Sequence, residues 1–396
     1  MILEISLATL LGIIIGVITG LSPGLHINLV STIVASSALS INPVALACFI
    51  ASLAITHTTI DFIPSIFLGA PEEDTFLAVL PGHKMLQQGE GFEATTIAMF
   101  GVFIGTLLSI LTTPILLFLA KIAESKITEL IPWILIAICL YLILRESSPL
   151  KALVFFTLAG FLGFTTTNLP LSEPLLPLLS GLFGASSLII SIKNKFSIPP
   201  QKIPKIKELK INKKEFLKTL TSAIIVSPIF SFLPALGSSY GSFMASELSS
   251  LTKKSFLFLN GLMNSIIMVS SISLVAKIGK ARTGAAAQIS ILLQESLLEK
   301  LPIIFFCIII SAIISLLIGI FLAKKASMIL SKINYTFLSI LVIALMIALI
   351  LKFSGLLGIL VFATATSIGI CTILSGIKRT NLMGSLLIPT IIFYLA

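Results

Sequence analysis

Charged residues are scarce in this sequence. They make up 11% of its 396 residues, against about a quarter in a typical soluble domain. Apolar residues make up 57%. A water-soluble globule would need polar atoms over much of its surface, and so few charges do not supply them. The composition therefore excludes a soluble enzyme, and equally a disordered, collagen-like or coiled-coil chain.

Catalytic and metal-binding motifs are missing as well. The sequence contains no Walker loop, no HExxH, no GxSxG and no paired catalytic carboxylates. It therefore gives no support to ATP-driven transport or hydrolysis. The four cysteines lie in apolar runs without CxxC spacing, which indicates buried thiols rather than disulfides or metal ligands. We expect no catalytic residue, no metal and no cofactor beyond a coupling ion, H⁺ or Na⁺.

Long apolar runs dominate what is present. A bilayer core about 30 Å thick needs about 20 helical residues, and these runs are continuous rather than alternating. They predict an all-α integral membrane protein. Glu4 stands where a signal peptide needs positive charge, so the first run is expected to be a retained span. Further clear spans are expected near 94–120, 130–145, 149–165, 173–191, 298–323, 333–351, 355–375 and 382–396.

The positive charge is concentrated in one segment. The net charge is +10, and residues 193–218 contain nine lysines and two glutamates, which together give +7. Basic loops beside membrane spans tend to stay in the cytoplasm, so this segment is predicted to be a cytoplasmic linker. It is also suited to contact anionic lipid headgroups. Nucleic acid is not an expected partner.

The sequence repeats itself at offsets of 203, 207 and 213. The matching pairs are Phe118–Lys121 with Phe321–Lys324, Leu153–Phe155 with Leu360–Phe362, and Thr167–Leu169 with Thr380–Leu382. Three matches in the same order indicate two homologous halves. The predicted organisation is a first transmembrane repeat at 1–192, the basic linker at 193–218 and a second transmembrane repeat at 219–396.

Loop charges predict that the second half is inverted. The loop after Lys121 balances its lysines with glutamates and is placed outside, whereas the matching loop, Lys324 to Lys332, has no acid and is placed inside. Lys378 and Arg379 also fall inside. Equivalent loops on opposite sides are typical of secondary transporters with inverted repeats. The protein is thus expected in the cell membrane, with both termini extracellular.

Each half is predicted to begin with a broken or re-entrant helix. Pro23 and Pro234, 211 residues apart, each interrupt an apolar run. Paired breaks of this kind point to a transporter's binding site, because the freed helix tip offers backbone N–H groups to an anion. The alternative is a kink with satisfied backbone groups. The candidate substrate-binding residues are Pro23, Gly24, His26, Asn28, Pro234, Gly237, Ser238, Ser239, Tyr240, Asn260 and Asn264.

Other ionisable residues are candidates for coupling or for attracting the anion. They are His57, Thr58, Asp61, Lys84 and Arg282. His57, Thr58 and Asp61 form a relay if they lie at membrane depth, and cost little if they lie at the interface. Lys84 and Arg282 either receive an anionic substrate or belong to basic loops at the membrane edge. Asn260 and Asn264 share one helix face, and either bind substrate or join two helices.

The segment Leu80–Ala94 resembles a known family. Gly82, Met85, Gly89, Glu90 and Ala94 match a Gly-x-x-Met-x-x-x-Gly-Glu-x-x-x-Ala-like run of the large membrane subunit of tripartite tricarboxylate transporters, most closely its short archaeal relatives. The resemblance implies an ion-coupled carboxylate transporter with two re-entrant elements. The sequence departs from the family in being about a hundred residues shorter than the bacterial subunits, and in having His57–Asp61 where they have a Gly-rich loop.

Three functions remain open on the sequence. The first is a secondary transporter that moves an anionic, carboxylate-type substrate by alternating access between two half-helix tips. The second is a translocase for polyprenyl phosphate, a lipid carrier, because the Pro23–Gly24 opening resembles that family more distantly. The third is a membrane-embedded lipid-modifying enzyme, for which His26, His57 and Asp61 are the candidate groups. The expected partners are an anionic small molecule or lipid phosphate, membrane lipids, and further copies of the chain in a homo-oligomer.

The predicted topology can be tested with single cysteines introduced into a variant that lacks the four native ones. We expect an impermeant maleimide added to intact cells to label position 126 and to leave positions 202 and 325 unlabelled until the membrane is permeabilised. Labelling of 126 and 325 from the same side would contradict the inverted repeat.

Overall fold

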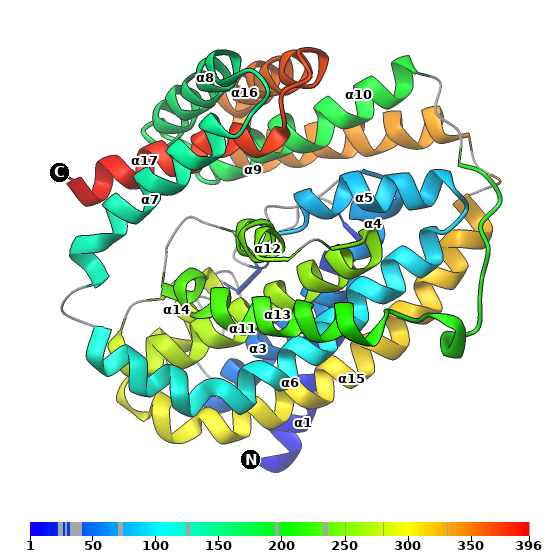
Figure 1. Cartoon of the computed structure of the whole chain (residues 1–396). Coiled ribbons are helices and arrows are strands. Elements are labelled where there is room, and N and C mark those ends of the chain that lie inside the picture. Colours follow the sequence, from blue (N-terminus) through cyan, green and yellow to red (C-terminus); the bar gives the residue numbers. More distant parts are fainter. Residues whose placement is uncertain are drawn as a thin grey trace. The chain divides into compact units, whose positions relative to one another are not determined.

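The computed structural model describes residues 1–22, 27, 30–31, 42–69, 74–123, 127–194, 198–232, 237–249, 251–279, 281–330, 332 and 334–395 (Figure 1). Every regular element in these segments is a helix. Nine of the described helices are long and apolar enough to cross a bilayer. Many apolar side chains on them are exposed, as expected for surfaces that face lipid. The predicted fold class, an all-α integral membrane protein, is confirmed.

The helices follow most of the spans that the sequence predicted, but the last one, predicted as a span at 382–396, has only 12 residues and is too short to cross a bilayer. In chain order they are α1 (Ile2–Leu21), α3 (Pro43–Ile60), α4 (Phe62–Phe67), α5 (Phe76–Gln87), α6 (Gly91–Ala123), α7 (Ile127–Leu144), α8 (Pro149–Thr167), α9 (Leu175–Leu179), the π-helix η1 (Ser180–Ala185), α10 (Ser186–Lys193), the 3-10 turn η2 (Ile206–Glu208), α11 (Lys213–Phe232), α12 (Ser238–Glu247), α13 (Lys253–Ile278), α14 (Gly284–Leu293), η3 (Gln294–Ser296), α15 (Leu297–Leu330), α16 (Tyr335–Leu374), η4 (Arg379–Met383) and α17 (Gly384–Leu395).

The chain folds into two compact units, and each unit takes residues from both sequence halves. Unit 1 consists of Met1–Phe67, Leu77–Glu124 and Ile198–Lys332. Unit 2 consists of Leu68–Phe76, Ser125–Ser197 and Ile333–Ala396. Unit 1 thus combines the first part of each half, and unit 2 combines the last part of each half.

Within unit 1, equivalent helices recur at nearly constant offsets. Helix α11 begins 211 residues after α1, α13 begins 210 after α3, and α15 begins 206 after α6. The packing is repeated with the halves exchanged, because α3 of the first half packs on α15, and α13 of the second half packs on α6. In unit 1, each half therefore packs one of its long helices against a long helix of the other half.

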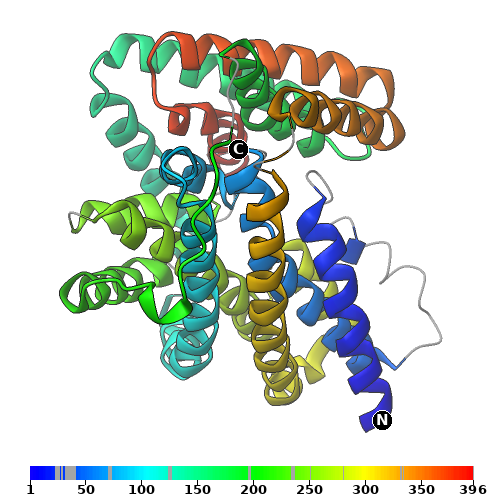
Figure 2. The same cartoon turned by 90° about the vertical axis from the view of Figure 1, so that its right-hand side faces the viewer.

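Equivalent helices of unit 1 also run in opposite directions. Helices α3 and α15 run parallel, and the Ser315 hydroxyl donates a hydrogen bond to Thr59 between them. Helix α6 is antiparallel to both (Figure 2). Helix α13 runs parallel to α6, since Gly105 lies against Leu262 and Ser109 against Ser270. Helix α13 is thus antiparallel to α3, its counterpart in the first half.

Glycines allow the closest of these helix contacts. A Cβ atom added at Gly101 of α6 would lie 2.2 Å from the carbonyl oxygen of Phe258 in α13. One added at Gly261 of α13 would lie 2.0 Å from that of Ala98 in α6. Apolar side chains gain little by leaving lipid, so membrane helices associate through such close backbone contacts.

The same polar contact joins the first two long helices of each half. Asn42, the N-cap of α3, donates to Glu4 of α1 at 3.3 Å. Thr252, the N-cap of α13, donates to Glu215 of α11 at 2.7 Å. Glu4 and Glu215 are 211 residues apart. Because of these pairs, α3 begins beside the start of α1, and α13 begins beside the start of α11.

Unit 2 follows the same exchanged pattern. Helices α7 and α8 of the first half pack on α17, and α16 of the second half packs on α9, η1 and α10. A Cβ atom added at Gly163 of α8 would lie 1.8 Å from the carbonyl oxygen of Ser385 in α17. Helix α16 is broken at Gly355, with φ 63° and ψ −162°, where the sequence predicted two spans to meet.

Substitution of Gly101 by alanine should destabilise unit 1. The new methyl group would overlap the Phe258 carbonyl and force α6 away from α13, which we expect to cost about 1–3 kcal/mol, as in other overpacked interiors. Thermal unfolding of the detergent-solubilised protein would show this as a lowered Tm. Leu111→Ala, at a side chain of α6 that is 76% exposed, serves as the control and should unfold at the wild-type temperature. Equal Tm values for Gly101→Ala and wild type would contradict the proposed role of the contact.

Candidate substrate site

Helix α12 is the central feature of the candidate site. It begins at Ser238 with Gly237 as its N-cap and has 10 residues. At a rise of about 1.5 Å per residue it is about 15 Å long, half of what a bilayer core requires. It packs against α11 and α13 within unit 1. A short helix thus follows α11 in the second half, in the region where the sequence predicts a re-entrant or broken helix.

Serine side chains line the buried side of α12. Ser238, Ser239 and Ser242 are all fully buried, and so is Tyr240. The Ser242 hydroxyl donates to the carbonyl oxygen of Ser238 at 2.9 Å. Because residues three and four apart share one face of a helix, these hydroxyl groups gather at the start of α12 rather than encircling it.

Asn260 of α13 joins this serine cluster. Its Nδ2 donates to Ser239 Oγ at 3.4 Å and to Ser242 Oγ at 3.3 Å. In the part of the chain that the structure describes, Asn260 Oδ1 is buried and has no hydrogen-bond partner. A buried carbonyl oxygen of this kind calls for a ligand or water that donates to it. Asn264, 4% exposed, lies one turn further along α13.

The structure brings some of the candidate residues together and adds one that the sequence did not single out. Asn260 and the α12 serines come from separate segments of the sequence and lie together. Ser242 was not among the predicted residues, although its spacing from Ser238 and Ser239 placed it on the same helical face. The remaining predicted tip residues, Pro23, Gly24, His26, Asn28 and Pro234, lie outside the described residues.

A second polar cluster forms near the end of α3. His57 is 2% exposed, and its Nδ1 lies 3.0 Å from Thr19 Oγ1 of α1. The Thr19 hydroxyl donates to the carbonyl oxygen of Gly16, so its oxygen accepts from His57 Nδ1–H. A neutral His57 ring then has Nε2 as its acceptor nitrogen. Thr19 was not predicted, because its contact with His57 depends on the packing of α1 against α3.

The neighbours of His57 are buried as well. Asp61 is 4% exposed and accepts from Ser65 Oγ at 3.2 Å. Thr58 donates to the carbonyl oxygen of Ala54 in its own helix. All of them lie within Pro43–Phe67, a stretch long and apolar enough to span a bilayer. Ionisable residues inside such a stretch are expensive, and they usually line a cavity or a proton path.

Lys84 and Arg282 occupy different surroundings. Lys84 is exposed in the last turn of α5. Arg282 is half-buried just before α14, where its backbone N–H donates to Ser271 Oγ at 3.2 Å. In the described part of unit 1, no hydrogen bond joins the Lys84 side chain to the serine cluster of α12.

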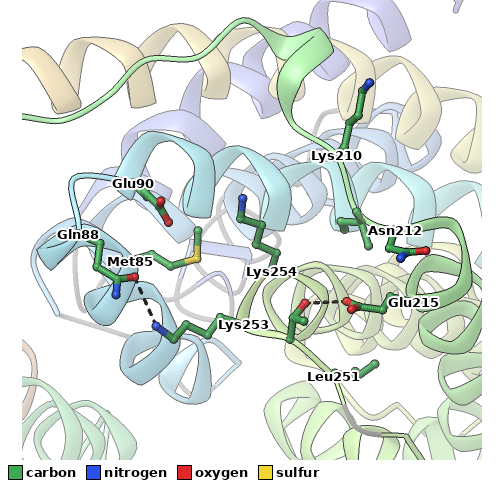
Figure 3. A pocket seen from close by; sticks show the side chains of 11 residues that line it. Met85, Gln88, Glu90, Lys210, Asn212, Glu215, Leu251, Lys253 and Lys254 are labelled. Atoms are coloured by element: carbon green, nitrogen blue, oxygen red, sulfur yellow. Dashed lines mark hydrogen bonds between the residues drawn. The ribbon is translucent and has the colours of Figure 1, made fainter.

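A pocket of about 660 Å³ opens at the starts of α11 and α13 (Figure 3). Its lining mixes both charges, and most of the side chains that form it are already paired. Lys254 lies 2.5 Å from Glu93, Lys253 donates to Gln88 at 3.4 Å, and Glu215 accepts from Thr252. The pocket therefore offers an anion fewer unpaired donors than its lysines suggest.

Comparison of the sequence with known proteins identifies the family of this chain. Residues 7–384 match the model of the tripartite tricarboxylate transporter TctA family. A protein of Methanocaldococcus jannaschii, described as uncharacterized, is 33% identical over 362 residues, which cover 88% of each chain. No solved structure matches the chain significantly.

The family match covers nearly the whole chain and includes α12, α13 and the His57 cluster. Its description implies membrane transport of tricarboxylate-type anions, which agrees with nine apolar helices in the described segments. The polypeptide is a multi-pass membrane protein. The chain belongs to the tripartite tricarboxylate transporter TctA family, a family of membrane transporters.

Proposed function

We propose that this chain is a secondary transporter that moves a carboxylate-type anion by alternating access. The observation that carries the proposal is the buried start of α12, where Ser238, Ser239 and Ser242 meet Asn260. The substrate would bind at this tip and at the corresponding first-half segment, Pro23 to Asn28. The family match supports a carboxylate rather than a lipid phosphate as the transported group.

The chemistry of the α12 tip suits an anion. The N-terminal end of a helix carries partial positive charge, and its first backbone N–H groups have no partner within the helix. Gly237, the N-cap of this helix, adds no side chain at this end. Serine hydroxyls can donate to carboxylate oxygens, while Asn260 Oδ1 can accept from a hydroxyl or protonated carboxyl group, or coordinate a coupling cation.

The helix directions of unit 1 support an inverted repeat. Helices α3 and α13 are equivalent in sequence position and run antiparallel, and both begin at a capped contact with a glutamate. A site between inverted repeats can be exposed to either side of the membrane by the same motion of each half in turn. In this scheme the linker at 193–218 lies in the cytoplasm and both termini lie outside the cell membrane.

We assign coupling to the buried cluster of α3. His57 is an ionisable residue buried in a membrane-spanning stretch, and its ring is held by the hydrogen bond between Nδ1 and Thr19. Asp61 supplies a carboxylate one helical turn away. Lys84 and Arg282 would attract the substrate rather than bind it. Accessory subunits and further copies of the chain are the proposed partners.

Substitution of Asn260 by alanine should weaken substrate binding. The change removes the amide that orients Ser239 and Ser242, and one lost hydrogen bond to a charged group corresponds to about ten- to a hundredfold in affinity. Binding of a panel of di- and tricarboxylates, including citrate, would be measured by calorimetry on purified protein. Gly237→Val should abolish uptake into proteoliposomes, because its branched side chain occupies the approach to the tip.

Two control variants belong to the same experiment. Asn168→Ala changes an exposed asparagine at the end of α8, and Lys202→Ala changes the linker, so both should bind and transport as wild type does. If the ligand that binds wild type also binds Asn260→Ala with unchanged affinity, the site lies elsewhere. If polyprenyl phosphate binds and no carboxylate does, the substrate assignment is wrong.

Replacement of His57 by glutamine should flatten the pH dependence of transport. Glutamine can still donate to Thr19 but cannot take up a proton, so the part of the pH dependence of uptake that comes from His57 should be lost. Uptake would be measured from pH 5 to pH 8. His83, which contacts the carbonyl oxygen of Ile66, provides the matched control through His83→Gln. An unchanged pH profile in His57→Gln would remove His57 from the coupling mechanism.

A further inference from the structure

A buried arginine in unit 2 has no acidic partner. Arg379 of η4 is 8% exposed, and no described carboxylate lies within ion-pair distance of it. Its Nη1 donates to Ser187 Oγ at 2.7 Å, and its Nη2 donates to the carbonyl oxygen of Phe183. Both acceptors are neutral. The burial of a charge without a counter-charge is one of the least favourable arrangements in a protein.

The guanidinium group nevertheless remains charged. Burial lowers the pKa of Arg379 to about 10, which is still far above neutral pH. The guanidinium carbon also lies 5.4 Å from the centre of the Phe183 ring, whose electron-rich face stabilises a cation. A ring face reduces the cost of the buried charge but does not neutralise it.

The described carboxylate that contacts the residues on either side of Arg379 in the sequence is used elsewhere. Glu146, in the loop between α7 and α8, accepts from Asn381 Nδ2 at 3.1 Å and lies 3.9 Å from Lys378 Nζ. Lys378 therefore has the counter-charge that Arg379 lacks, although the two residues are adjacent in sequence.

Several buried polar atoms in the sequence segment that begins at Arg379 have no partner within the described residues. The Nε of Arg379 makes no hydrogen bond, and neither do Asn381 Oδ1 and Ser385 Oγ, although all three atoms are buried. Three such atoms within seven residues are unusual, since buried polar groups are almost always bonded to protein, water or a ligand. The missing partner of the arginine must be an acceptor and preferably an anion.

The backbone beside Arg379 is also irregular. Phe183 belongs to the π-helix η1, a single widened turn between α9 and α10. Widened turns of this kind are frequent at functional sites. The Phe183 carbonyl oxygen of this turn and the Ser187 hydroxyl of α10 hold the two Nη groups in place, and Nε is left for another partner.

We propose that Arg379 is the centre of an anion site in unit 2 that binds a phosphate-class oxyanion. Two oxygens of the anion accept from Nε–H and a neighbouring Nη–H, the edge of the guanidinium that suits phosphate best. The site lies where α16 ends and α17 begins, a position at which phospholipid headgroups meet membrane proteins. The anion is either free phosphate or the headgroup of an anionic lipid.

The location favours access from the lipid surface. Leu374 at the end of α16 is 63% exposed, and Leu150 and Leu153 at the start of α8 are 78% and 46% exposed. Acyl chains can cover these side chains while a headgroup reaches inward to Arg379. This site is separate from the tip of α12, which belongs to unit 1, and it does not depend on the proposed transport function.

The test compares wild type with Arg379→Gln and Arg379→Lys. Native mass spectrometry of detergent-purified protein would detect retained phosphatidylglycerol, and thermal unfolding would detect stabilisation by inorganic phosphate against chloride at equal ionic strength. We expect binding in wild type and a ten- to a hundredfold loss in Arg379→Gln. Arg379→Lys keeps the charge but lacks Nε–H, so it should fold normally and still bind more weakly.

The matched control is Arg145→Gln, which removes an exposed arginine of the same unit that donates to Tyr141 and should leave binding unchanged. Lipid retention that is lost in Arg379→Gln identifies a headgroup site, whereas phosphate stabilisation without lipid retention identifies a free-anion site. Either result supports the proposal. Absence of both in wild type, or equal binding by Arg379→Lys and wild type, would overturn it and leave Arg379 as a structural clamp of the π-helix.

Discussion

Every backbone N–H and C=O group inside a bilayer core must find a partner within the protein, because lipid tails offer none. A broken helix is tolerated at this depth only where other helices enclose it. Helix α12 meets this condition, since it packs against α11 and α13 and its serines bond to one another and to Asn260. The same constraint makes the break useful, because a helix end with backbone N–H groups is a natural place for an anion to replace a missing partner.

The close contacts between helices follow from the same environment. Without a strong hydrophobic force between surfaces already in lipid, helices associate where their backbones can approach. Gly101 and Gly261 supply that approach between α6 and α13, and Gly163 supplies it between α8 and α17. In each case one helix comes from the first sequence half and its partner from the second. The two halves are therefore held together by exchange of helices rather than by contact between two separate domains.

The features that repeat along the chain were predictable from the sequence, and those that depend on packing were not. Apolar length predicted most of the spans, and the spacing of Pro23 and Pro234 pointed to the region after α11, where the structure has the short helix α12. Contacts between side chains of different helices could not be predicted without knowing which helices are neighbours. They include Ser242 with Asn260, Thr19 with His57, and Ser315 with Thr59. Arg379 is the clearest case. Its sequence neighbourhood suggests a basic loop at the membrane edge, whereas the side chain is buried against Phe183.

The break at Gly355 makes the two halves mechanically different. In the first half α7 and α8 are joined by residues 145–148, whereas in the second half the equivalent helices meet at a single residue in a conformation that side chains with a Cβ rarely adopt. A four-residue connection has many backbone torsion angles that can change, so the two helices it joins can tilt independently. A single residue has only two such torsion angles, φ and ψ, so bending of α16 at Gly355 follows a nearly fixed path. The connection between α7 and α8 is therefore more flexible than the joint at Gly355, so these two pairs of helices need not contribute equally to motion.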